Sequence, residues 1–186
     1  VLLTVPWLCM QIYYSVPFFG IVFGITDEVV FYKKYIPYYD DFVYCFGQSY
    51  GNMPVSNGAY SVANSGQFLQ KYNDDLSSII SSTVIGSGTK TSNLVPGAFM
   101  VSNCKEVYIS GWGGLANGDF VGTTGLPVTS DAHQLNTNGS DFYFMLLGED
   151  FTTLKYATFF GGNTLYEHVD GGTSRFDPSG TIYQAV

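Results

Sequence analysis

The stretch "NDDLSSIISSTVIGSG" at residues 73–88 decides the fold, because the chain repeats its pattern 75 residues later. The second copy reads "GEDFTTLKYATFFGGN" and covers residues 148–163. Each copy contains an acidic pair, an apolar residue, two hydroxyl residues and an apolar residue, followed later by a threonine, two apolar residues and a glycine. Recurrence at a long interval indicates a structural unit that the chain builds more than once.

Two further landmarks recur in the same order. An apolar residue followed by tyrosine opens "VYCFGQS" at Val43, "VYISGWG" at Val107 and "IYQAV" at Ile182, at spacings of 64 and 75 residues. A proline-centred segment appears as "MPVSNGAY" from Met53 and as "LPVTSDAH" from Leu126. Because order and spacing both hold, the landmarks indicate a true internal repeat.

The landmarks divide the chain into units. Residues 43–106 and 107–181 form two repeats, and residues 182–186 begin another. The N-terminal segment 1–42 matches poorly and is interpreted as a degenerate preceding unit. The second repeat is longer because of the insertion "GGLANGDFVGTT" at 113–124, which is glycine-rich and polar and is therefore predicted to be a surface loop.

Each unit is predicted to contain four short strands. Runs such as "EVYISGW" and "LKYATFF" are short, apolar or alternating, and none reaches helix length with a period of 3.6 residues. The sequence "DPSG" at 177–180 matches a type I turn position by position. With 15 Tyr, 15 Phe and 22 Gly but only 12% charged residues, the composition is also typical of strands and tight turns.

Repeated units of four antiparallel strands predict an all-β protein, and specifically a β-propeller. Each blade would be apolar on both faces and would need neighbouring blades to cover it. About two and a half blades are visible, whereas a ring typically needs 4–8, so we expect the propeller to be part of a longer chain. The alternative is a β-sandwich, which does not require repetition.

Four segments of the second repeat resemble the SBBP repeat, a bacterial propeller repeat: "VYISG" (107–111), "LPVTSDAHQ" (126–134), "SDFYFMLL" (140–147) and "LKYATFFGG" (154–162). The first repeat departs from the pattern, since it lacks the Asp-aromatic opening and has Ser81 in place of tyrosine. Such repeats occur in large secreted or surface proteins, including those of gliding, type IX-secreting Bacteroidetes. The resemblance therefore implies an exported scaffold and no catalytic residues.

Charge excludes several classes of partner. A net charge of -8 with seven Lys and Arg residues argues against nucleic acid and against an anionic membrane surface. Residues 1–26 carry no charge and are long enough to span a bilayer. Pro6, Gln11 and Pro17 interrupt this window and favour buried strands. A component of an outer-membrane-associated complex stays an alternative.

Two motifs suggest catalysis or nucleotide binding and are interpreted as loops. "GSGTKTS" at 86–92 lacks the contiguous Gly-Lys-Ser/Thr of a phosphate-binding loop, and no helix pattern follows, so we expect a connection between blades. "SNCK" at 102–105 fits the Ser-x-x-Lys pattern of penicillin-interacting enzymes. It aligns with "DPSG" at 177–180, however, and is predicted to be a hairpin turn.

Carboxylates and possible metal ligands are sparse. The pairs Asp74-Asp75 and Glu149-Asp150 are predicted turns with a solubility role, because adjacent strand residues point to opposite faces and cannot flank a substrate as glycosidase carboxylates do. A Ca²⁺ contact is the alternative. His133 and the "EHVD" segment at 167–170 are expected in exposed loops, since His168 and Asp170 offer two ligands without an evident third.

The cysteines, tryptophans and glycosylation motif support no further site. Cys9, Cys45 and Cys104 lack metal-ligand spacing, and the odd count leaves at least one thiol free or paired outside the chain. "NGS" at 138–140 is a formal glycosylation acceptor. Trp7 and Trp112 could stack on sugar rings, but most aromatic residues are expected in the core.

The sequence therefore predicts a non-enzymatic scaffold or binding module of a large secreted or cell-surface bacterial protein, linked to gliding motility, adhesion or type IX secretion. Its expected partners are other protein domains, surface glycans and the remainder of its own longer chain, and its expected location is extracellular or on the outer cell surface. No catalytic residue, cofactor or metal site is predicted. A propeller glycosidase is an alternative, although Arg175 is the only arginine available.

Overall fold

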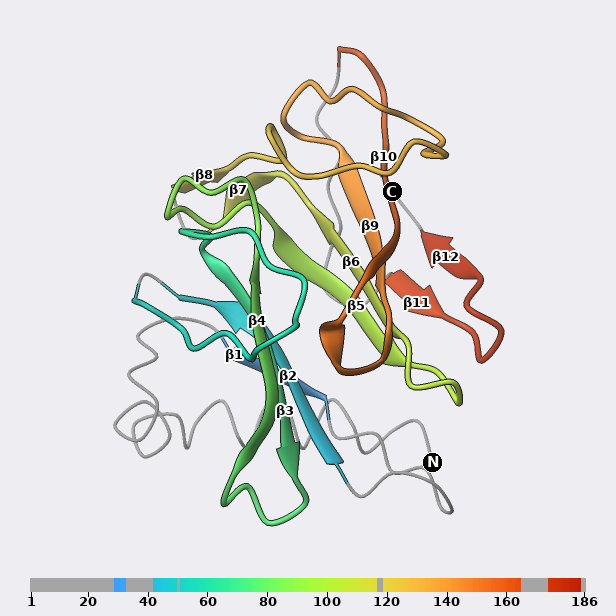
Figure 1. The fold of residues 1–186 in the computed structure, drawn as a ribbon. Coiled ribbons are helices and arrows are strands. Elements are labelled where there is room, and N and C mark those ends of the chain that lie inside the picture. Colours follow the sequence, from blue (N-terminus) through green and yellow to red (C-terminus); the bar gives the residue numbers. More distant parts are fainter. Residues whose placement is uncertain (1–28, 33–41, 50, 117–118, 165–173, 185–186) are drawn as a thin grey trace.

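The chain is all-β over the residues that the structure, a computed structural model, describes: 29–32, 42–49, 51–116, 119–164 and 174–184 (Figure 1). The strands are arranged in antiparallel sheets, and a single turn of 3₁₀-helix, η1 (Glu149–Phe151), interrupts them in these ranges. Within the same ranges, no helix has the length and apolar character that crossing a lipid bilayer requires.

Two four-stranded sheets dominate the fold, and each is a simple meander in chain order. The first has the order β1-β2-β3-β4, with strands β1 (Val29–Tyr32), β2 (Phe42–Gln48), β3 (Gln67–Asn73) and β4 (Ile79–Ile85). The second has the order β5-β6-β9-β10, with strands β5 (Val95–Val101), β6 (Val107–Trp112), β9 (Phe142–Leu147) and β10 (Leu154–Phe160). Two hairpins complete the described chain: β7 (Gly114–Ala116) with β8 (Asp119–Val121), and β11 (Ser174–Phe176) with β12 (Ile182–Gln184).

The repeated stretches at 73–88 and 148–163 occupy the same place in the two sheets. Each begins in the turn before the last strand and continues through that strand, which is β4 in the first sheet and β10 in the second. The register agrees, because Ile85 of β4 pairs with Gln67 at the start of β3, and Phe160 of β10 pairs with Phe142 at the start of β9. Ser81 and Tyr156 are therefore structural counterparts.

The sheets are offset from the sequence repeats by one strand. Residues 43–106 contribute β2, β3 and β4 to the first sheet but β5 to the second, because a tight turn at residues 102–106 pairs β5 with β6. The four-stranded sheets thus span residues 29–85 and 95–160. The insertion at 113–124, predicted as a surface loop, contains the β7–β8 hairpin.

The two proline-centred segments cover the outer edges of the sheets. The Ser56 backbone N–H donates to the carbonyl of Ser82 in β4, and the Ser82 N–H donates back to Ser56 Oγ. In the second sheet, Thr129 makes the same pair of bonds with Ala157 of β10. The hydroxyl at this position satisfies an edge-strand N–H that would otherwise be open to another chain.

The main core lies between the two sheets. It joins Tyr44, Phe46 and Leu69 of the first sheet to side chains of the second that include Val107 and Ile109. The Phe46 ring stacks on Phe99 of β5, with ring centroids 6.1 Å apart. The inward positions of β6 alternate, as a pleated strand requires.

The opposite faces of both sheets are apolar as well. In the first sheet, Val43, Cys45, Phe68, Tyr72 and Val84 form a second buried cluster. In the second sheet, Trp112 and Phe142 form a third, with Val95 and Phe144 against it. Both sheets therefore have two apolar faces.

The β11–β12 hairpin covers the second sheet on the side away from the first sheet (Figure 1). Tyr108 lies between Val107 and Ile109 in β6 and so points to this outer face. Its ring contacts that of Phe176 in β11 at a centroid separation of 5.7 Å. Three layers therefore follow one another in chain order, although the described residues form no closed ring.

Burial predicts a large difference between two phenylalanine substitutions. Phe46→Ala removes a ring that is 0% exposed between the sheets and should lower the free energy of unfolding by about 3–5 kcal/mol. Phe160→Ala removes a ring that is 48% exposed and should cost less than about 1 kcal/mol. Urea denaturation of both variants measures the difference, and equal losses would contradict the inter-sheet core.

Candidate functional site

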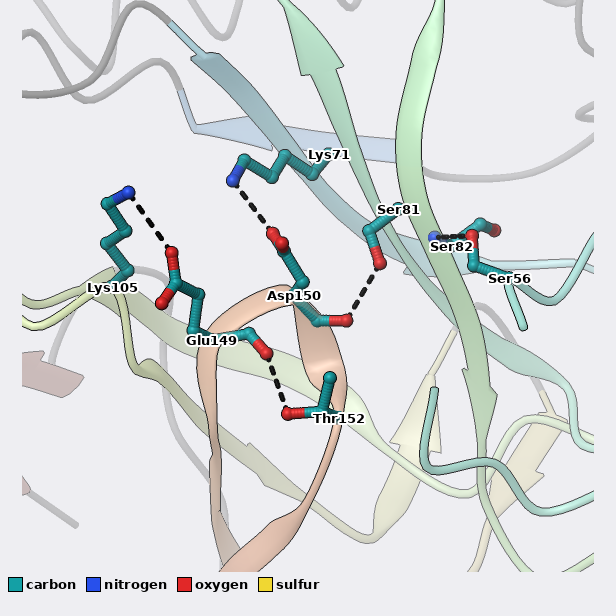
Figure 2. A network of polar contacts seen from close by, with 8 residues as sticks. All are labelled: Ser56, Lys71, Ser81, Ser82, Lys105, Glu149, Asp150 and Thr152. Atoms are coloured by element: carbon teal, nitrogen blue, oxygen red, sulfur yellow. Dashed lines mark hydrogen bonds and ion pairs between the residues drawn. The ribbon is translucent and has the colours of Figure 1, made fainter. Parts of the chain in front are cut away.

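A buried lysine joins the two sheets. Lys71 of β3 has a side chain only 3% exposed, and its Nζ donates to Asp150 Oδ1 at 2.8 Å (Figure 2). Asp150 lies in η1, in the turn between β9 and β10 of the second sheet. The two residues are 79 positions apart in the chain, so the ion pair exists only when the sheets are packed.

Aromatic rings surround the Lys71 ammonium on its own sheet. Its Nζ lies 4.1 Å from the ring centroid of Phe42 and 5.7 Å from that of Tyr44, both in β2. A ring face attracts a cation, and this attraction strengthens when water is excluded. The rings and the Asp150 carboxylate together offset the cost of removing the ammonium from water.

The η1 turn is shaped to present Asp150. Asp150 has φ 54° and Phe151 has φ 63°, both in the left-handed region. Ser81 Oγ donates to the Asp150 carbonyl at 2.8 Å, and the Tyr60 N–H donates to the Phe151 carbonyl at 2.8 Å. The Phe151 side chain is fully buried in the main core. The carboxylate, the backbone carbonyls and the Phe151 ring of this one turn thus all contact the first sheet or its β2–β3 connection.

Two exposed ion pairs flank this contact. Lys105 Nζ lies 3.1 Å from Glu149 Oε1, with the two side chains 41% and 53% exposed. Lys155 pairs with Glu106, and the hydrogen bond to that carboxylate raises the pKa of Lys155. Exposed pairs contribute little to stability, so Lys71 and Asp150 are the energetically distinct pair.

A second polar contact joins the sheets at the other end of the strands. Gln48 of β2 and Gln67 of β3 both donate through Nε2 to the carbonyl of Leu94, at 2.7 and 2.6 Å. The Asn93 N–H donates to Gln67 Oε1, and Asn93 Nδ2 donates to the Gly122 carbonyl. The connection into β5 is therefore fixed to the first sheet before the second begins.

The two loop motifs have the predicted local structure. Residues 86–92 lie in the connection from β4 to β5, between the two sheets. Residues 102–105 form the β5–β6 turn, where the Lys105 N–H donates to the Ser102 carbonyl. Gly180 makes the equivalent bond to Asp177, and Lys105 and Gly180 share the left-handed region with φ 60° and 89°.

The acidic pairs form turns as predicted, but only one of them is exposed throughout. Asp74 and Asp75 lie in the β3–β4 turn, where hydrogen bonds from Ser77 lower the pKa of Asp75. The prediction of a mere turn and solubility role missed the contact of Asp150 with Lys71. The available signal was a lysine inside the strand "QFLQKYN", away from both of its ends.

The remaining candidate side chains do not converge. His133 is exposed and lies 6.0 Å from the Phe160 ring, while Trp112 is buried. Asn138 of the "NGS" motif bonds to Ser140 and Gly162. Over the described ranges, no three His, Cys, Asp or Glu side chains gather as metal ligands would. The other candidates lie outside the described residues: Trp7, Cys9, Glu167, His168 and Asp170.

No family model, curated protein or solved structure matches the chain. The resemblance to the SBBP repeat therefore stays a prediction.

The buried pair predicts an asymmetric response to charge removal. Asp150→Asn keeps a residue that tolerates φ 54° but leaves the Lys71 ammonium buried without a carboxylate, and should cost about 2 kcal/mol. Lys71→Met removes the buried charge and leaves Asp150 half-exposed, so it should cost about 1 kcal/mol or less.

Thermal or urea unfolding of these variants and of the double variant measures the coupling. Lys105→Met, which removes an exposed pair beside the same turn, is the control and should stay within about 0.5 kcal/mol of the parent. A greater loss for Lys71→Met than for Asp150→Asn would exclude this role for the pair.

The two described thiols should differ in reactivity. Cys45 is buried in β2, where burial raises the pKa of its thiol, while Cys104 is exposed in the β5–β6 turn. Since the thiolate is the nucleophile, iodoacetamide should alkylate Cys104 in the native protein and Cys45 only after denaturation. Peptide mass mapping distinguishes the sites, and equal native rates would show that β2 is not protected.

Proposed function

We propose that the chain is part of a β-propeller that serves as a non-enzymatic scaffold or binding module of a larger, exported bacterial protein. The observation that carries the proposal is the coverage of the second sheet on both faces. Tyr44 and Phe46 of the first sheet pack on one face, and Phe176 of the next hairpin packs on the other. A two-layer sandwich has no third layer, whereas successive blades of a propeller do.

The order of the strands supports the same architecture. The strand β5 contacts both β2 and β11, so early strands of the three layers lie near one another. The late turn η1 contacts β4, the last strand of the first sheet. In a propeller, the early strands of successive blades lie near one another at the axis, and the last strands lie toward the outside. These contacts fit that arrangement.

The use of the polar side chains supports a scaffold rather than a hydrolase. A glycosidase places two carboxylates on either side of its substrate. Here the adjacent Glu149 and Asp150 pair with Lys105 and Lys71, and the buried Lys71–Asp150 pair joins the two sheets. Partners such as protein domains or surface glycans would then contact the loops beyond the sheets, while the repeat supplies rigidity.

The proposal rests on the resemblance to the SBBP repeat for export and for the cell surface. Gliding motility, adhesion and type IX secretion are the processes in which such a module would act.

Negative-stain electron microscopy of the purified protein, in the oligomeric state fixed by native mass spectrometry, tests the ring. We expect class averages with a central channel surrounded by 4–8 blades, contributed by one longer chain or by associated chains. Particles of a compact two-layer shape, at any oligomeric state, would contradict the propeller and favour the sandwich.

A further inference from the structure

A polar cavity of about 220 Å³ opens beside the first sheet. It lies between the loop that follows β2 and the connection that follows β4. Ser49, Ser65 and Val84 are its buried walls, and Asn52, Asn64 and Lys90 are exposed at its rim. All of these residues belong to the first sheet or to its loops, so the cavity does not depend on how many sheets follow.

The electrostatics of the cavity differ from those of the chain. The protein carries a net charge of -8, yet no carboxylate is among the described residues that line the cavity. Lys71, Lys105 and Lys155 each pair with an acidic side chain. Lys90 is the one lysine in the described ranges with no such ion pair. Lys90 thus supplies the one positive charge among the described lining residues, whose other polar side chains, on Ser49, Asn52, Asn64 and Ser65, are neutral.

The walls of the cavity are held in place. The Lys90 N–H donates to the carbonyl of Asn64, and both residues lie in the left-handed region, with φ 60° and 59°. A Cβ at Gly66 would clash with the backbone of Thr91, so only glycine permits the two loops to meet there. A site fixed before the ligand arrives loses less entropy on binding.

The repeat does not require this cavity. By register, Gln48 of β2 corresponds to Trp112 of β6, because each pairs with the first residue of the next strand in its sheet. In the second sheet the chain after Trp112 closes tightly, since a Cβ at Gly114 would overlap the indole ring and one at Gly113 would clash with the Gly139 carbonyl. The cavity therefore lies at a position where the first repeat departs from the second.

We propose that this cavity binds a monosaccharide-sized ligand that carries a carboxylate, such as a uronic acid. The Lys90 ammonium would pair with the carboxylate, and the amides of Asn52 and Asn64 would bond to ring hydroxyls. Charge-assisted hydrogen bonds are stronger than neutral ones, so the carboxylate provides most of the discrimination. The assignment goes beyond the proposed scaffold and stands whether or not the sheets belong to a ring.

Saturation-transfer NMR and titration with D-glucuronate and D-galacturonate test the site on the intact protein. We expect millimolar or tighter binding of at least one uronate, and weaker binding of D-glucuronamide, which has the same size without the charge. Lys90→Gln should weaken uronate binding about tenfold or more. Asn64→Gly, which keeps the left-handed backbone and removes the amide, should weaken binding of the uronate and of the neutral amide alike.

Lys105→Gln is the matched control, because Lys105 is another lysine with a left-handed backbone but lies at the far end of β5. It should leave uronate affinity unchanged. Absence of saturation transfer to both uronates overturns the proposal, as does equal binding of glucuronamide or an equal loss in Lys105→Gln. A compact two-layer particle in microscopy would overturn the propeller and leave these outcomes unaffected.

Discussion

The structure depends on one constraint, which is that each four-stranded sheet is apolar on both faces. A sheet of this kind cannot be exposed to water on either side, so it needs a neighbour on each. The second sheet has a neighbour on each face. Phe99 packs on Phe46 of the first sheet, and Tyr108 packs on Phe176 of the β11–β12 hairpin. Stacking of successive layers meets this requirement for the second sheet, because the β11–β12 hairpin covers the face that the first sheet leaves open.

Apolar packing alone does not fix how two such sheets align. Polar contacts at the two ends of the interface between the sheets do so. The Lys71 ammonium pairs with the Asp150 carboxylate at one end, and the Gln67 amide donates to the Leu94 carbonyl at the other. A buried ion pair adds little net stability but penalises every alignment that separates its charges. In the second sheet, Leu146 occupies the strand position that Lys71 occupies in the first sheet. The buried ion pair is therefore a feature of this one interface between sheets and not of the repeat.

The sequence predicts what is local or repeated. Residue patterns alone predict the all-β class, the turns at Ser102 and Asp177, and the correspondence of β4 with β10. The structure confirms all three. The Lys71–Asp150 pair could not be predicted, because nothing in the chain marks which of several acids a strand lysine meets across 79 residues. The sequence did not predict that residues 43–106 contribute to both sheets, because β5 could have paired with the edge strand of either sheet.

The most direct test of stacked layers is a nuclear Overhauser experiment on isotope-labelled protein, directed at the two faces of the second sheet. Stacked layers predict cross-peaks from the Phe46 ring to Phe99 on one face and from the Tyr108 ring to Phe176 on the other, in the same sample. Cross-peaks for the first pair without the second would show a two-layer protein whose outer face is open, and would contradict the constraint from which the fold has been derived.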